Sequence, residues 1–119
     1  MTRVPTSNSK YGNIREKIDG YSFDSRAEAS RYLELKLLER SGEIERLIVH
    51  PRWELHVPTI TGEQEKVCEY EADFEYWDNT TNMGVVEDVK SGATKTRLYI
   101  IKKKWLLLQY GIEVKEIMT

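Results

Sequence analysis

Asp73, Asp88 and Lys90 have the residue types and the spacing of a hydrolytic metal site. Asp88 and Lys90 stand two apart at the end of a Val-rich strand predicted over residues 83–89, so they share one face of it. A turn near residues 79–82 would place Asp73, on the preceding predicted strand, nearly opposite Asp88. Two such carboxylates repel each other unless a cation lies between them, and oxygen ligands are typical of Mg²⁺. A lysine beside the cation could orient or deprotonate an attacking water, which indicates phosphodiester hydrolysis.

The pattern acid-x-Lys occurs three times, so its context has to distinguish this copy from the others. The copy at 34–36 falls in a predicted helix, where residues two apart do not face each other. The copy at 113–115 falls on a predicted strand but has no acid on a hairpin partner. Asp73 also belongs to a row of acids at every second residue, which is typical of the solvent face of a half-buried strand. Glu87 faces away from Lys90, which leaves it either beside the site or on the surface.

Glu28 is the third candidate acid. It lies on the apolar side of a predicted helix, four and seven residues before Tyr32 and Leu35. An acid on that side indicates a cleft. The alternative is a capping box, in which Glu28 bonds back to the amide of Ser25 and has no other role. The sequence favours neither interpretation over the other.

The net charge of -2 hides an uneven distribution of charge. Residues 90–105 hold six basic side chains and no acid, whereas residues 63–88 hold nine acids and one lysine. A metal-dependent enzyme that acts on nucleic acid needs such a pairing, because the basic side attracts phosphates and the acids hold the cation. The alternative is an ordinary solvated surface. The candidate phosphate contacts are Arg97, Lys102, Lys103 and Lys95 in the basic stretch, with Arg15 and Lys17 near the N-terminus.

The elements that must position these residues follow from periodicity and from helix caps. A helix is predicted over residues 25–40, between a cap at Asp24 or Ser25 and a stop at Gly42. A second helix is predicted over 95–110. Strands are predicted over 44–49, 53–57, 67–77, 83–89 and 112–117. This order predicts an α/β fold in which helices flank a central mixed sheet.

Three burial patterns accompany these elements. The first helix has a broad apolar face, predicted to be covered on more than one side, at Tyr32, Leu33, Leu35, Leu37 and Leu38. The strand over 67–77 is predicted to bury one continuous row, which consists of Cys68, Tyr70, Ala72, Phe74 and Tyr76. The second helix is predicted to bury a stripe at three- and four-residue steps, which consists of Leu98, Ile101, Trp105 and Leu108.

The length of 119 residues predicts a single domain over 14–119, preceded by a flexible polar arm over 1–13. No apolar run approaches the roughly 20 residues of a membrane span, and the N-terminus lacks an apolar leader. Cys68 is the single cysteine, which excludes an internal disulfide and fits a cytoplasmic location. With His50 and His56 it forms only a poor zinc set, because their spacing matches no zinc motif.

The sequence resembles the PD-(D/E)XK nuclease superfamily at Glu28, Asp73, Asp88 and Lys90. It resembles more closely a family of small phage and prophage proteins catalogued as a domain of unknown function. That likeness spans about residues 10–117, and its motifs are KYGN at 10–13, FDSRAEA at 23–29, GEI at 42–44, YEADF at 70–74 and VEDVK at 86–90. Ala72 stands where the superfamily name has Pro, and Asp88 stands where Glu is more frequent.

The resemblance implies a restriction-endonuclease-like core in the order α-β-β-β-α-β and a Mg²⁺- or Mn²⁺-dependent deoxyribonuclease. It implies that Asp73 and Asp88 bind the metal, that Glu28 completes the metal site, and that Lys90 acts on the attacking water. By analogy with other small members, the expected substrate is branched DNA such as a four-way junction. The expected state is a homodimer in the cytoplasm of a bacterial host.

Two alternatives come from other functional classes. The chain could be a catalytically silent nuclease fold that binds DNA or a replication partner. It could also be an interaction protein unrelated to nucleic acid, with the acidic row as its binding surface. Metal binding separates the last alternative from a nuclease, and DNA affinity with a steep salt dependence separates it from the silent fold.

Overall fold

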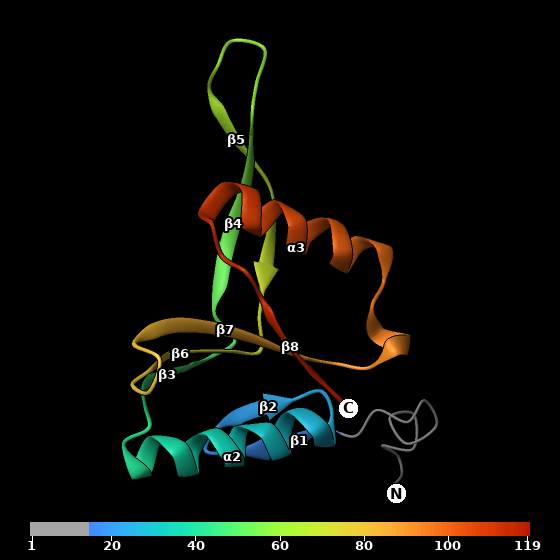
Figure 1. Cartoon of the computed structure of the whole chain (residues 1–119). Coiled ribbons are helices and arrows are strands. Elements are labelled where there is room, and N and C mark those ends of the chain that lie inside the picture. The colour runs from blue at the N-terminus through green and yellow to red at the C-terminus, as the bar shows by residue number, and fades with distance from the viewer. Residues whose placement is uncertain (1–14) are drawn as a thin grey trace, which may run out of the picture.

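The computed structural model describes residues 15–119 as two helices on a four-stranded sheet with two attached hairpins (Figure 1). The arm predicted over 1–13 lies outside the described residues. The helical segments are α2 (Arg26–Ser41), η1 (Gly92–Thr94) and α3 (Arg97–Tyr110). The strands are β1 (Glu16–Ile18), β2 (Tyr21–Phe23), β3 (Ile44–Val49), β4 (Arg52–Pro58), β5 (Gln64–Glu71), β6 (Phe74–Asp78), β7 (Met83–Lys90) and β8 (Lys115–Met118).

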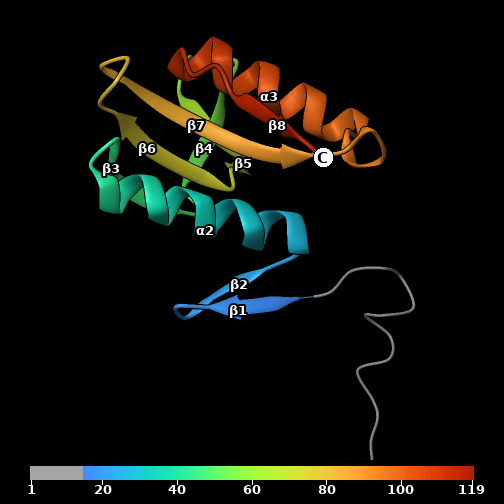
Figure 2. The same cartoon turned by 60° about the horizontal axis from the view of Figure 1, so that its bottom comes forward.

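The main sheet has the strand order β3-β6-β7-β8. The pairs β3–β6 and β6–β7 are antiparallel, and β8 runs parallel to β7. The predicted mixed α/β sheet is therefore confirmed. Figure 2 shows the sheet between α2 and α3, and the chain passes through these elements in the order α2-β3-β6-β7-α3-β8. Among residues 15–119 no helix is long and apolar enough to cross a membrane.

Helix α2 begins and ends where its caps predict. Ser25 accepts a hydrogen bond from the Glu28 amide, and Gly42 ends the helix at a φ of 86°, a left-handed conformation that favours glycine. The prediction that this helix is covered on more than one side is confirmed, because the main sheet and the β1–β2 hairpin both pack against it, but Leu33 and Leu37 are exposed. Only one face packs on the sheet, in a core with members from β2, α2, β3 and β6 that consists of Phe23, Ala29, Tyr32, Leu35, Ile44, Phe74 and Tyr76.

The predicted strand over 67–77 is two strands that belong to different sheets. The chain breaks at Ala72–Asp73, so β5 pairs with β4 in a separate hairpin, while β6 enters the main sheet. Every second residue of the predicted row stays buried or partly buried across the break, but the row is divided between two hydrophobic cores. Phe74 and Tyr76 face α2, whereas Tyr70 and Ala72 join the second core on the α3 side. The β4–β5 hairpin rises away from the main sheet, and α3 lies across it (Figure 1).

The predicted buried stripe of α3 is also wrong. Leu98 and Leu108 are 64% and 73% exposed, and Ile101 is exposed as well. The fully buried residue is Leu106, and Trp105 packs partly against the same core. Apolar residues occur all around this helix, so their spacing does not select a face, and the contact with β4 and β5 decides it.

Candidate functional site

The β6–β7 hairpin brings Asp73 and Asp88 together. Phe74 pairs with Glu87 across the two strands, so the two aspartates are next to each other one step further along. The Asp73 amide donates to Asp88 Oδ1 at 2.9 Å, and the Val89 amide donates to Asp73 Oδ2 at 2.7 Å. Each carboxylate is thus held by the backbone of the opposite strand. Asp73 is partly buried and hydrogen-bonded to β7, so it is not part of a solvent-facing row of acids.

Helix α2 supplies the third acid. Half of the capping box is present, since Ser25 Oγ accepts from the Glu28 amide at 3.1 Å. The carboxylate of Glu28 lies toward His50 and Asp73, with Glu28 Oε1 3.7 Å from His50 Nε2. The Glu28 side chain is 12% exposed. Glu28 therefore has two roles in the first turn of α2. Its amide takes part in the helix cap, and its carboxylate lies beside His50 and Asp73.

His50 is a member of this cluster that the sequence did not assign to it. One possible ligand atom each from Glu28, His50 and Asp73 lies within 4.8 Å of the other two. The His50 amide donates to the Asp73 carbonyl at 3.0 Å, and its ring lies 5.8 Å from the ring of Phe23, measured between centroids. A signal was available, because His50 directly follows the predicted strand over 44–49 and directly precedes Pro51.

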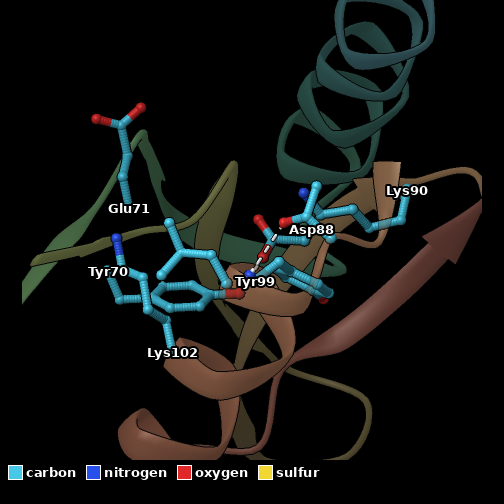
Figure 3. A pocket seen from close by; sticks show the side chains of 8 residues that line it. Tyr70, Glu71, Asp88, Lys90, Tyr99 and Lys102 are labelled. Atoms are coloured by element: carbon cyan, nitrogen blue, oxygen red, sulfur yellow. Dashed lines mark hydrogen bonds between the residues drawn. The ribbon is translucent and has the colours of Figure 1, made fainter. Parts of the chain in front are cut away.

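Lys90 and Asp88 lie on the α3 side of β7. Together with the end of β5 and the start of α3 they line an open pocket of about 200 Å³. Lys90 Nζ is 4.2 Å from the ring centroid of Tyr99, a cation–π contact that holds the ammonium group beside the carboxylates. The Tyr70 hydroxyl donates to Asp88 Oδ2. Figure 3 shows Asp88, Lys90 and Tyr99 close together in this pocket, with Glu71 pointing away from them.

The carboxyl groups of Glu28, Asp73 and Asp88 resist ionisation in the metal-free protein. Burial raises the pKa of Asp73 to about 7, and the negative charge of Glu28 adds to the shift. Burial also raises the pKa of Asp88 to about 6, against the opposing hydrogen bond from Tyr70. Burial raises the pKa of Glu28 in the same direction. Asp88 is buried and the other two acids are partly buried. A cation would stabilise the ionised form of acids whose pKa values are raised in this way.

Glu87 lies on the opposite face of β7 from Asp88 and is fully buried. It accepts two hydrogen bonds from the Arg31 guanidinium, at 2.9 Å from Nε and 2.6 Å from Nη2. It also accepts a hydrogen bond from the Tyr76 hydroxyl. This residue is therefore neither a surface group nor a member of the cluster. It connects α2 to β7 behind the site.

The predicted phosphate contacts lie in different surroundings. Lys102 lines the pocket beside Lys90 and Asp88. Lys95 and Lys103 both bind Glu116, at 2.8 Å and 3.2 Å. The remaining three candidates are exposed: Arg97 begins α3, Lys17 lies on β1, and Arg15 lies 3.4 Å from Asp24.

The donor set fits a hard divalent cation. Ligand oxygens of Glu28 and Asp73 converge from α2 and from the start of β6, and Asp88 at the end of β7 accepts a hydrogen bond from the Asp73 amide. Oxygen ligands are the ones that Mg²⁺ and Mn²⁺ prefer. Lys90 is the cationic side chain that opposes the charge of all three acids. The site therefore holds several carboxylates, a lysine and an open pocket beside them.

Comparison with known proteins identifies a family but no activity. The family model described as "Protein of unknown function (DUF1064)" matches residues 8–118. Neither the curated proteins nor the solved structures include a match to this chain. The chemistry of the site therefore has to be inferred from its own residues.

Proposed function

The chain belongs to the DUF1064 family of proteins of unknown function, and from this premise we propose that it is a metal-dependent endodeoxyribonuclease of the PD-(D/E)XK type. One observation carries the proposal. The carboxylates of Asp73 and Asp88 each accept a hydrogen bond from the backbone of the opposite strand at the open end of a hairpin, with Lys90 two residues after Asp88 on the same strand face. Glu28 reaches the same point from the first helix, as the resemblance of the sequence to that superfamily implies.

The order of the elements supports the same proposal. The two helices and the main sheet follow the order α-β-β-β-α-β, which is the order expected of a restriction-endonuclease-like core. The β4–β5 hairpin is an insertion between the first and second strands of this core. It leaves the end of the sheet that carries the acids open on the α3 side.

The proposed reaction is hydrolysis of a DNA phosphodiester. A water oxygen attacks phosphorus, the bond from phosphorus to the 3′ oxygen breaks, and the products are a 5′ phosphate and a 3′ hydroxyl. Glu28, Asp73 and Asp88 would hold Mg²⁺ or Mn²⁺, which supplies stabilisation of the charge that develops on the phosphate and on the leaving oxygen. Lys90 orients the attacking water, and the ring of Tyr99 keeps the ammonium group of Lys90 in place.

The proposed substrate is branched or structured DNA, including the four-way junction, in phage recombination or replication. The pocket places Lys102 beside the acids, where it can contact a phosphate next to the one that is cut. The proposed state is a homodimer in the bacterial cytoplasm, because cutting two strands of a junction needs two sites. Light scattering on the purified protein tests this state, and a mass equal to that of one chain contradicts it.

The test uses the wild type and the Asp88→Asn variant on labelled four-way junction, flap, single-stranded and linear duplex DNA with Mg²⁺ or Mn²⁺. Asn keeps the shape of Asp88 and can still accept from the Asp73 amide, so the fold should remain. We expect the wild type to cut at least one substrate and the variant to lose at least about 100-fold in rate, because a charged metal ligand is missing. The matched control is Glu113→Gln, in an exposed copy of the acid-x-Lys pattern, which should cut like the wild type.

A second candidate is a catalytically silent nuclease fold that binds DNA or a partner protein. Tight binding of one DNA structure by a wild type that cuts none of them would support this candidate and contradict the nuclease. Neither cutting nor binding would reject both. Equal cutting by the wild type and by Asp88→Asn would show that the activity comes from elsewhere.

A further inference from the structure

The imidazole of His50 lies where it could bind a metal together with Glu28 and Asp73, and it would contribute a nitrogen where the two acids contribute oxygens. Its Nε2 lies 3.7 Å from Glu28 Oε1, and a ligand atom of Asp73 lies within 4.8 Å of both side chains. A cation between these three groups would contact all of them after small movements of the side chains. The His50 side chain is 28% exposed, so a cation and its remaining waters can reach it.

The backbone holds His50 in this place. Its φ is 56°, in the left-handed region that non-glycine residues adopt uncommonly and in which asparagine, aspartate and histidine are the most frequent of them. Its amide binds the Asp73 carbonyl at 3.0 Å, which ties the histidine to the acid that it faces. The chain therefore leaves β3 in an uncommon conformation and presents the imidazole beside two carboxylates.

We infer that Glu28, His50 and Asp73 form a cation position in which His50 donates a nitrogen and which shares Glu28 and Asp73 with the metal site proposed above. This inference rests on the proposed function for the acids and adds a nitrogen ligand to them. Imidazole nitrogen binds Mn²⁺ and later transition metals readily, whereas Mg²⁺ prefers oxygen. The cation position should therefore select Mn²⁺ over Mg²⁺.

The test measures metal binding directly and does not depend on cleavage. The variant is His50→Asn, because asparagine tolerates a φ of 56° and removes the imidazole. The matched control is His56→Asn, which changes the second of the two histidines in the chain, on β4. Calorimetric titration gives the affinity for Mn²⁺ and for Mg²⁺. Pulsed electron paramagnetic resonance of bound Mn²⁺ detects a directly coordinated imidazole nitrogen.

We expect imidazole coupling in the wild type and in His56→Asn, and its loss in His50→Asn. The affinity for Mn²⁺ should fall by about tenfold or more in His50→Asn, since neighbours of metal ligands already contribute this much. The affinity for Mg²⁺ should change less than the affinity for Mn²⁺. Coupling that remains in His56→Asn assigns the nitrogen to His50 even when His50→Asn does not fold.

The outcomes separate this inference from the proposed function. Mn²⁺ that binds in an Asp88-dependent way without imidazole coupling would overturn the inference and leave the nuclease standing. Imidazole coupling in a protein that cuts no DNA would support the inference and count against the nuclease. Absence of metal binding to the wild type would overturn both.

Discussion

Asp73 and Asp88 each accept a hydrogen bond from the backbone of the other's strand. The pairing of the two strands therefore fixes the distance between the two side chains. The side chains would keep this arrangement in any variant that preserved the register of β6 and β7. Tyr70 adds a hydroxyl from β5 to Asp88, so a third strand orients the pair. The arrangement is costly without a cation, because buried carboxylates next to one another are hard to ionise.

This cost predicts how stability depends on pH in the metal-free protein. The pKa of Asp73 is about 7 in the folded state and roughly 4 in an unfolded chain. The folded state therefore binds the proton more tightly, and the contribution of Asp73 to stability falls as the pH rises from about 4 to about 7. We expect Asp73→Asn to gain stability relative to the wild type over this window, as measured by thermal unfolding in a chelator.

The control for this prediction is Asp78→Asn. Asp78 ends β6, and hydrogen bonds from Thr80 lower its pKa, so its contribution to stability is lost only as the pH falls below about 4 and stays constant over this window. Added Mg²⁺ or Mn²⁺ should raise the unfolding temperature of the wild type more at about pH 8 than at about pH 5.5, because protonated carboxylates do not bind metal. A difference between wild type and Asp73→Asn that does not change with pH would contradict the prediction.

At the scale of the elements, the site depends on where α2 lies relative to β7. Arg31 is one turn after Glu28, and Glu87 is the residue before Asp88. The ion pair between Arg31 and Glu87 is thus directly behind the two acids that these elements contribute. Its members are 56 residues apart in the sequence, so it fixes a tertiary contact that no local pattern contains.

We expect Arg31→Met to lower the free energy of unfolding by about 3–5 kcal/mol, because it leaves the buried Glu87 carboxylate without its partner. The double variant Arg31→Met with Glu87→Gln should recover a large part of this loss. The uncompensated charge is then gone, and the amide oxygen of the introduced glutamine can still accept from the Tyr76 hydroxyl. Urea unfolding of the single and double variants measures both quantities.

Arg40→Met is the matched control for this cycle. Arg40 is exposed in the last turn of the same helix, and its substitution should change the free energy of unfolding by less than about 0.5 kcal/mol. A double variant as unstable as Arg31→Met would show that lost packing, and not the unpaired charge, accounts for the effect.

At the scale of the whole molecule, the acids lie where four elements meet at one end of the sheet. These are the start of α2, the start of β6, the end of β7 and the start of α3. Two lysines of the basic stretch, Lys95 and Lys103, are paired with Glu116. Lys102 is the lysine of α3 that lines the pocket.

This distribution predicts which lysine on α3 contributes to DNA binding. In the Asp88→Asn background, which prevents cutting, Lys102→Ala should weaken binding and reduce the slope of log K against log salt by about 0.9 for one lost phosphate contact. Lys104→Ala is the control, since Lys104 is exposed and lies beside Trp105 and Leu108 in an apolar groove on α3. Fluorescence anisotropy at several salt concentrations measures the slopes. Equal slopes for the two variants would contradict the prediction.

Local signals in the sequence determined the elements and part of the site. Ser25 and Gly42 bound α2 because capping depends on residues a few positions apart. The pairing of Asp73 with Asp88 also follows from local information, because a hairpin with a short turn sets its own register. The bounds of α2 and the neighbouring acids are therefore properties of short stretches of chain.

Only the tertiary structure decided the rest. The break at Ala72–Asp73, the buried face of α3, the Arg31–Glu87 pair and the place of His50 all depend on contacts between distant segments. Alternation continues through the break with unchanged phase, so no pattern marks where one strand becomes two. A helix that is apolar on every side has no preferred face until its neighbours cover one. Packing selects among arrangements that local propensity leaves equal, and it is packing that brings a histidine from the end of β3 to the acids.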